Sequence, residues 1–269
     1  LARLSALTPG PGDRALIAHT PLYLQSAPPP APPAPRQPAD RLADLEARGL
    51  TARHAASGRG IEGATFGLAP GSLTVVTGRL GAGKTTLLET LLGLAPREAG
   101  EVLWNGRPVG DPASFFVPPR AAYVPQAPAL FSETLRENIL LGAPADGPAL
   151  AGAIWAAVLE EDVAGFPEGL DTVIGPRGVR LSGGQAQRVA AARALVRDPE
   201  LLVVDDLSGA LDADTEATLL ERLRERGVTC LAASHRRAVL GRADRVVVLA
   251  EGRIAADLAG SVDVLRSPA

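Results

Sequence analysis

Cysteine and methionine are almost absent from this sequence, and their scarcity already excludes some protein classes. Cys230 is the single cysteine among 269 residues, so a disulfide framework within the chain is impossible. A reducing, cytosolic compartment suits such a chain best. Cys230 also lies inside an apolar run, which predicts a small buried core residue rather than a reactive thiol.

Methionine is missing altogether, and the chain begins at Leu1. We therefore expect a piece of a longer protein rather than a complete translation product. No apolar run approaches the about 18 to 20 residues that a membrane-spanning helix needs, and the start does not resemble a signal peptide. These residues by themselves are expected to be soluble.

An excess of positive charge is also missing. The formal net charge is -3 and the sequence pI is about 5.7, so no basic surface indicates nucleic acid as a partner. Lys84 is the only lysine, and the remaining cationic side chains are arginines. Hydrophobic residues make up 46% of the sequence, which permits a sizeable core in one large domain or two small ones.

The single lysine lies in the most informative stretch, Leu73 to Gly93, which reads as a strand, a glycine-rich loop and a helix. The loop fits the phosphate-binding pattern of Gly, four residues, Gly, Lys and Ser or Thr. Its glycines let successive backbone N–H groups surround a polyphosphate, and the helix adds its positive dipole end. The residues expected to contact a nucleotide here are Gly78, Arg79, Leu80, Gly81, Ala82, Gly83, Lys84, Thr85 and Thr86.

Lys84 and Thr85 have distinct expected roles. The lysine can reach the β- and γ-phosphates of ATP, and the threonine hydroxyl is placed to bind Mg²⁺. A glycine-rich turn without any ligand is the alternative. It is the weaker interpretation because the pattern fixes four positions, and because the flanking strand and helix are the elements that such a loop requires.

Residues 1–40 differ in composition from the rest of the chain. The segment Pro28 to Pro38 is PPPAPPAPRQP, and proline lacks the backbone donor that helices and interior strands need. We predict a linker at the exit from an upstream domain, with a ligand for a proline-recognition domain as the alternative. Residues 41–269 are then expected to form one α/β domain.

The first half of this domain is predicted to be rich in strands. We expect an edge strand over about Leu42 to Thr51 and a turn and a further strand within 58–71. The Asn105-Gly106 pair predicts a tight hairpin. Another strand should run from Ala121 and end just before Gln126.

The region from about 127 to 198 is mostly helical by pattern, with one helix near Ala149 to Glu161 and another that begins at the LSGGQ segment, 181–185. Asp198-Pro199 should end the second helix. We interpret this region as a helical subdomain inserted in the α/β domain. A separate second domain is the alternative, and it is disfavoured because strand patterns resume immediately afterwards.

Acidic residues and a histidine follow the last predicted strands. Leu201 to Val204 is expected to be a buried strand that delivers Asp205 and Asp206 at its carboxyl end, where open parallel sheets bind ligands. A helix should follow over Asp212 to Arg226, and the next strand should end just before His235.

In this order, the phosphate loop, Gln126, LSGGQ, Asp205, the segment SGALD at 208–212 and His235 resemble the nucleotide-binding domain of ATP-binding cassette (ABC) transporters. The match covers roughly Leu45 to Leu258. The resemblance implies an α/β fold in which a P-loop NTPase core sheet carries an antiparallel β subdomain and a helical insertion.

The resemblance also implies a head-to-tail dimer of two ATPase domains that sandwiches two ATP molecules with Mg²⁺. In it, Ser182, Gly183, Gly184 and Gln185 would complete the nucleotide site of the partner domain. Thr85, Gln126 and Asp205 would hold Mg²⁺, and His235 would touch the γ-phosphate. Asp212 would couple the two sites, and His54 would stack on adenine, although a solvent-exposed loop histidine is nearly as good an interpretation.

Two further segments resemble exporters whose membrane and ATPase domains share one polypeptide. They are LFSETLRENILLG after Gln126 and GLDTVIGPRGVRLSGGQ before the second helix. The ATPase domain of such a protein works at the cytoplasmic face of the membrane. Pro176 departs from the family pattern, which usually has glutamate there, so contact with the membrane domain is expected to differ.

Asp206 is a second departure from the pattern. The family usually has glutamate after the Mg²⁺-binding aspartate, as the general base for the attacking water. Aspartate is one methylene shorter, which withdraws the carboxylate by about 1.5 Å, whereas a base must approach its proton donor to about 2.6–3.2 Å. We therefore expect slow hydrolysis at this site, as in the less active half of a heterodimeric exporter, unless the backbone or a second water compensates.

The leading hypothesis is the ATPase engine of an exporter. A soluble ABC ATPase of translation or DNA maintenance is the first alternative, but the tandem cassette, basic face or long coiled-coil insertion that would support it is missing from the sequence. A regulatory subunit that binds ATP without hydrolysing it is the second, and only kinetics would distinguish it. The transported substrate cannot be read from these residues.

Overall fold

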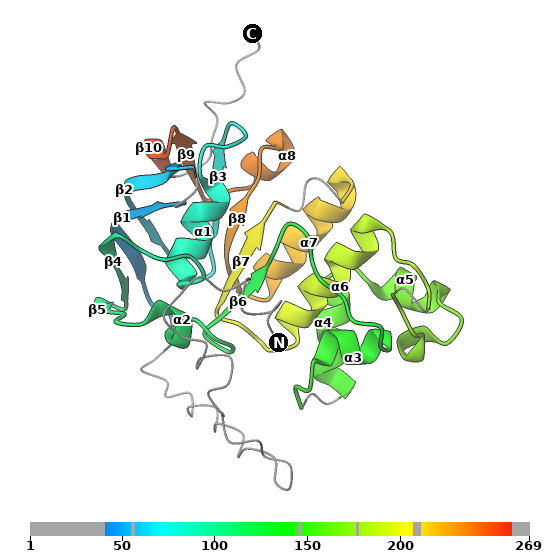
Figure 1. Ribbon diagram of the computed structural model, residues 1–269. Coiled ribbons are helices and arrows are strands. Elements are labelled where there is room, and N and C mark those ends of the chain that lie inside the picture. Colours follow the sequence, from blue (N-terminus) through cyan, green and yellow to red (C-terminus); the bar gives the residue numbers. More distant parts are fainter. Residues whose placement is uncertain (1–40, 55–56, 145–146, 176–177, 207–210, 260–269) are drawn as a thin grey trace, which may run out of the picture. The chain divides into compact units, whose positions relative to one another are not determined.

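The structure is a computed structural model that describes residues 41–54, 57–144, 147–175, 178–206 and 211–259. The proline-rich segment, Pro176 and residues 208–210 of SGALD lie outside these ranges. Within them, no helix is both long and apolar enough to cross a membrane. The strands form two sheets, and Figure 1 shows helix α1 (Lys84–Leu92) between them.

The smaller sheet is antiparallel, in the order β2 (Gly60–Leu68), β1 (Leu45–Arg53), β4 (Ala99–Trp104) and β5 (Arg107–Pro108). The predicted Asn105-Gly106 turn joins the last two strands, and both of its residues have positive φ, 53° and 72°. The prediction that the first strand lies at an edge is wrong, because β1 pairs with both β2 and β4. Alternating burial reveals a strand but not how many neighbours it has.

The larger sheet has the order β10 (Arg253–Ala259), β9 (Arg245–Ala250), β3 (Leu73–Gly78), β8 (Thr229–Ala233), β7 (Leu201–Asp205) and β6 (Ala121–Val124). All neighbours are parallel except β10, which is antiparallel to β9. Carboxyl ends of parallel strands share one edge of a sheet. The phosphate loop, Gln126, Asp205 and His235 therefore all emerge at that edge.

Burial on both faces explains the apolar strands of this sheet. Leu201 and Val203 contact the core that contains α1 and the smaller sheet, whereas Leu202 and Val204 contact the helices on the opposite face. This alternation follows from the period of two along a strand. The leucine side chains on one face of α1 are buried in the core that α1 shares with the smaller sheet, as their helical spacing predicts.

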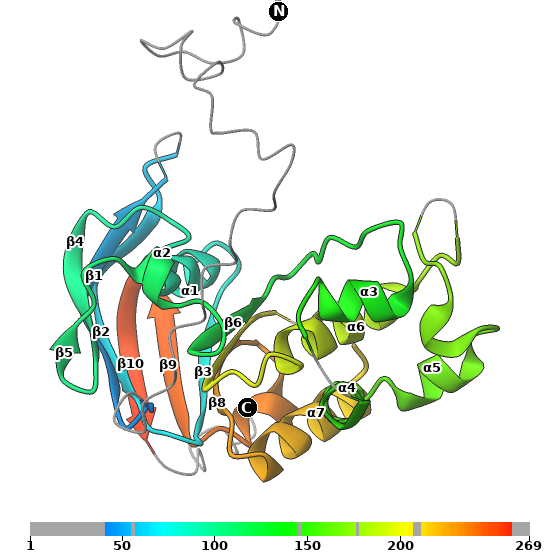
Figure 2. The ribbon, with the colours of Figure 1, turned by 90° about the horizontal axis from the view of Figure 1, so that it is seen from below.

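Most other helices cover the opposite face (Figure 2). They are α3 (Leu135–Leu140), α4 (Gly147–Ala156), α5 (Glu160–Gly165), α6 (Gly183–Leu195), α7 (Ala213–Glu225) and α8 (Arg237–Leu240), with a 3₁₀ turn at Gly169–Asp171. The short α2 (Pro112–Phe115) follows β5. Residues 127–198 thus supply α3 to α6, and several of their side chains share one core with the sheet.

The prediction of one helix from Ala149 to Glu161 is wrong. The chain forms α4 and α5 instead, separated at Val158, whose φ is 55°. A β-branched residue rarely adopts this left-handed conformation. Here it closes the end of α4, because the N–H groups of Val158 and Leu159 donate to the carbonyl oxygens of Trp155, at 2.9 Å, and Ile154, at 3.1 Å. The next residue, Leu159, is fully buried in the helical core, which is the contact that the break allows.

Candidate active site

The loop between β3 and α1 needs glycine at two of its positions. Gly78 has φ 146°, and a Cβ there would lie 2.2 Å from the carbonyl oxygen of Leu249. Gly83 has φ 102°, and its Cβ would lie 2.9 Å from the carbonyl oxygen of Gly60. Across the described ranges, no side chain caps the first turn of α1. Its N–H groups and dipole therefore face the loop, as an anion site requires.

The ammonium group of Lys84 lies over this loop. Its Nζ donates hydrogen bonds to the carbonyl oxygens of Gly78, at 2.9 Å, and Arg79, at 3.2 Å. The neighbouring hydroxyl of Thr85 donates to Oδ1 of Asp205 across 3.1 Å. The phosphate loop thus brings one cation, one hydroxyl and one carboxylate to the same edge of the sheet.

Asp205 is nearly enclosed, with 3% of its surface exposed. Its second oxygen, Oδ2, accepts a hydrogen bond from the hydroxyl of Tyr123 at 3.3 Å. Burial raises the pKa of this carboxyl above its usual range, although the bonds from Thr85 and Tyr123 oppose the shift. Burial, and then the negative charge of Asp205, raise the pKa of the Tyr123 phenol, so at neutral pH the phenol is the donor.

These groups suit Mg²⁺ by their chemistry. The Thr85 hydroxyl, the Asp205 carboxylate and the Gln126 side-chain amide are all hard oxygen donors, and they line one cavity of about 270 Å³. Mg²⁺ is commonly held by one or two protein oxygens together with substrate phosphates and water. No group of three or more His, Cys, Asp and Glu that could hold a metal occurs in the described ranges, so a site built on protein carboxylates alone is not offered there.

The same cavity gathers many of the predicted site residues. Its lining is His54, Ser57, Arg59, Gly60, Leu80, Gly81, Gly83, Lys84, Thr85, Thr86, Gln126, Asp205 and Asp206. Gly78, Arg79 and Ala82 belong to the loop without lining the cavity. Ser182, Gly183, Gly184, Gln185 and His235 are likewise not part of the lining.

His54 follows β1 directly and borders the cavity. Its Nε2 lies 3.0 Å from Oγ1 of Thr86, in the first turn of α1. This contact holds the imidazole beside the phosphate loop.

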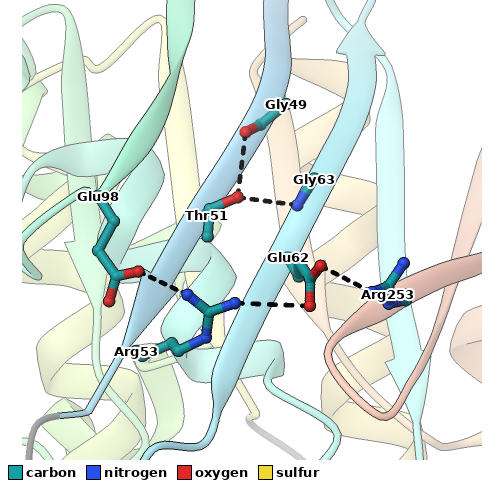
Figure 3. A network of polar contacts seen from close by, with 7 residues as sticks. All are labelled: Gly49, Thr51, Arg53, Glu62, Gly63, Glu98 and Arg253. Atoms are coloured by element: carbon teal, nitrogen blue, oxygen red, sulfur yellow. Dashed lines mark hydrogen bonds and ion pairs between the residues drawn. The ribbon is translucent and has the colours of Figure 1, made fainter.

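An ion-pair network anchors the end of β1 just before His54 (Figure 3). Arg53 pairs with Glu98, at 2.7 Å, and with Glu62 on β2, at 3.5 Å. Glu62 also pairs with Arg253 on β10, at 2.7 Å. All four side chains are substantially exposed, so each pair contributes at most about 1 kcal/mol. Together the pairs link β1, β2 and β10 next to His54.

The LSGGQ segment forms a regular helix start. Ser182 caps α6: its Oγ accepts from the N–H of Gln185 at 3.2 Å, and its own N–H donates to Oε1 of Gln185 at 2.9 Å. The Gln185 amide also donates to Asp162 on α5, which pairs with Arg188 at 2.8 Å. These contacts commit the Gln185 side chain within its own chain, while Ser182 and Gly183 are exposed.

Asp206 and His235 both interact electrostatically with one buried carboxylate, that of Glu216 on α7. Asp206 has φ 48°, a left-handed conformation that aspartate tolerates better than most residues. Glu216 on α7 is 3% exposed and pairs with Arg236, next to His235, at 2.8 Å. Burial raises the pKa of Glu216. Interactions with Arg236 and His235 lower this pKa, and the charge of Asp206 raises it. The ends of β7 and β8 are therefore electrostatically linked through α7.

A family model described as ABC transporter matches residues 61–208, more than half of the chain. This chain belongs to the ABC transporter family. The match spans the phosphate loop, Gln126, the LSGGQ helix and both aspartates. It thereby confirms the resemblance, and the observed arrangement of the two sheets and the helices is the ABC ATPase fold.

Individual ABC proteins are similar over most of the chain. An ATP-dependent lipid A-core flippase of Burkholderia orbicola (strain AU 1054) is 40% identical over 204 residues, which are 75% of this chain and 34% of the flippase. A probable multidrug resistance ABC transporter ATP-binding/permease protein, YheI of Bacillus subtilis (strain 168), is 38% identical over 71% of this chain and 33% of its own length. The chain thus spans about a third of these relatives.

A solved structure agrees with this assignment. A bacterial Atm1-family ABC exporter with ATP bound matches with a TM-score of 0.76 and 31% sequence identity, over 87% of this chain and 42% of the exporter chain. The similarity in sequence and in structure therefore extends to an ABC protein that holds ATP.

Several residues around this ABC site escape sequence reasoning. Arg59 and Ser57 line the cavity from the loop after β1. Tyr123 bonds Asp205, and the buried Gln187 on α6 donates to the carbonyl oxygens of Pro125 and Gln126. A buried tyrosine or glutamine does signal a needed partner, but the partner depends on strand order and helix placement, which one sequence does not reveal.

Proposed function

We propose that this chain binds ATP with Mg²⁺ and hydrolyses it as the engine of an ABC exporter. The observation that carries the proposal is the convergence of Lys84, Thr85 and Asp205 on one cavity at the carboxyl edge of the parallel sheet. A cation, a hydroxyl and a carboxylate beside an uncapped helix start are the groups that polyphosphate binding requires.

Each residue has a role in this proposal. Lys84 binds the β- and γ-phosphates, and the loop amides orient them. Thr85, Gln126 and Asp205 hold Mg²⁺, which when bound neutralises the charge that develops on the phosphates. Asp206 accepts a proton from the attacking water, and His235 donates to the γ-phosphate. His54 stacks on the base, because its ring borders the cavity and is held by Thr86.

The LSGGQ segment supports a head-to-tail dimer. Ser182 and Gly183 are exposed and do not line the cavity that contains Lys84. An exposed helix start that does not line its own chain's cavity is available to the nucleotide of another ATPase domain, as the family resemblance implies. In this arrangement Asp212, at the start of α7, lies in the loop that couples the two sites.

The exporter assignment rests on the relatives, of which this chain spans about a third. We infer a membrane domain on the same polypeptide, with residues 1–40 as its exit linker and this ATPase domain at the cytoplasmic face. Asp206 in place of glutamate favours a heterodimer in which the present site is the slower one. A soluble ABC ATPase that is not coupled to transport is the alternative.

Sedimentation of the chain with and without ATP tests the nucleotide-driven dimer. With ATP, Mg²⁺ and a slowly hydrolysing site, we expect association into dimers, and with ADP we expect monomers. An unchanged sedimentation coefficient at saturating ATP would exclude association of two copies of this chain, and the head-to-tail proposal then requires the different partner domain that Asp206 favours. Bound nucleotide measured in the same samples separates failure to bind from failure to associate.

A further inference from the structure

The hydroxyl of Tyr123 donates a hydrogen bond to the carboxylate of Asp205, at 3.3 Å. Tyr123 lies on β6, and its backbone pairs with Val203 of β7, two residues before Asp205. Its ring is half-buried against the core on the α1 side of the sheet. The register between β6 and β7, and the side of the sheet that Tyr123 faces, together place its hydroxyl at the carboxyl end of β7.

The two oxygens of Asp205 have different donors. Oδ1 accepts from Thr85, which belongs to the phosphate loop, and Oδ2 accepts from Tyr123, which belongs to the sheet. Two donors on opposite oxygens fix the plane of a carboxylate, whereas one donor leaves it free to rotate about its Cα–Cβ and Cβ–Cγ bonds. Groups that orient a metal ligand in this way typically change metal affinity about 10- to 100-fold when removed.

We propose that Tyr123 is a positioning residue that orients the Asp205 carboxylate toward the divalent cation accompanying bound ATP. The proposal rests on the proposed function, since it assumes that Asp205 and Thr85 hold Mg²⁺. The hydroxyl of Tyr123 remains bonded to Oδ2 from the sheet side, and Oδ1 stays on the Thr85 side, where the cation binds.

Tyr123→Phe tests this directly because it removes the hydroxyl and keeps the ring that packs against the core. The experiment uses the full chain and measures ATP affinity by equilibrium titration over a series of Mg²⁺ concentrations and again in EDTA. We expect unchanged affinity in EDTA and a rise of about 10-fold in the Mg²⁺ concentration that gives half of the Mg²⁺-dependent gain. Thermal unfolding of the variant reports whether the fold is intact.

Two reference variants separate the possible outcomes. Asp205→Asn should abolish most of the Mg²⁺-dependent gain, and if it does not, the proposed metal site itself is wrong. Phe116→Leu alters another aromatic residue of the same core, one that has no hydroxyl to donate to Asp205, and its Mg²⁺ dependence should match that of the unaltered chain. If Asp205→Asn loses the gain while Tyr123→Phe keeps the original Mg²⁺ midpoint, or weakens binding equally in EDTA, the positioning role is overturned and the proposed function stands.

Discussion

Thr85 and Asp205 are 120 residues apart in the sequence, and the hydroxyl of the first lies 3.1 Å from a carboxylate oxygen of the second. The contact joins the first turn of α1 to the carboxyl end of β7. It exists because β3 and β7 are both bonded to β8 in one parallel sheet, so that their ends share an edge.

Lys84→Ala should weaken ATP binding by at least about 10- to 100-fold, because hydrogen bonds between charged groups contribute roughly 1.5–3 kcal/mol. Stability should hardly change, since the lysine bonds only to carbonyls of an exposed loop. Equilibrium titration with ATP is the measurement. Arg107→Ala is the control, because it removes the same charge from exposed β5. Unchanged affinity in Lys84→Ala would refute the assigned site.

Ser182→Ala should leave ATP binding by this chain intact and reduce turnover of the assembled dimer, since Ser182 completes the partner's site. It also removes a helix cap, which costs about 0.5–2 kcal/mol of stability. Thr134→Ala is a matched control, because Thr134 caps α3 with the same reciprocal pair of bonds, here to Glu137.

The two cap variants should lose similar stability in denaturant unfolding, but only Ser182→Ala should lose turnover. If Thr134→Ala lowers turnover as much, the effect comes from helix stability alone. If Ser182→Ala weakens ATP binding by the separate chain to the same extent as turnover, the head-to-tail arrangement is wrong.

Asp206→Glu should raise hydrolysis at this site with little change in ATP affinity, because a longer carboxylate reaches the water in the transition state. A 10-fold gain corresponds to about 1.4 kcal/mol of barrier. The positive φ of Asp206 slightly disfavours the substitution, since glutamate adopts the left-handed conformation less readily than aspartate does. Single-turnover hydrolysis by the complete transporter, with the partner's site disabled, measures it.

Asp206→Asn provides the comparison, since it retains the left-handed conformation and removes the base. We expect slower hydrolysis than with aspartate. A rate that does not increase in Asp206→Glu would indicate that Asp206 already reaches the water, or that slowness arises in the partner's LSGGQ segment.

Cys230 should make stability fall at alkaline pH. It is 2% exposed on β8, and burial raises the pKa of its thiol from 9.0 to about 12. The folded chain therefore holds this proton at pH values where the unfolded chain releases it. The thiol's contribution is complete below about pH 9 and is lost as pH rises from 9 toward 12, at about 1.4 kcal/mol per pH unit.

Urea unfolding at pH 8 and pH 10 tests this, with Cys230→Ala as the reference variant that lacks the thiol. The stability advantage of the unaltered chain over the variant should shrink by about 1.4 kcal/mol between the two pH values. An advantage that stays constant would mean that the thiol ionises equally well in the folded state.

Local patterns in the sequence determined much of this protein. The phosphate loop, the start of α6 at LSGGQ, the hairpin at Asn105-Gly106 and the strand that ends at Asp205 are all set by neighbouring residues. Glycine conformations, capping side chains and apolar periodicity act within a few positions, so one sequence suffices to predict them.

Tertiary structure alone decided which of these pieces meet. Strand order places β1 in the interior of its sheet and brings Tyr123 to Asp205. These outcomes depend on contacts between segments that are distant in the sequence, such as the pairing of Leu45 with Trp104 on β4, or the bond between Tyr123 and Asp205, which are 82 residues apart. Such pairings are chosen by the total burial and hydrogen bonding of the fold, and no local pattern encodes that sum.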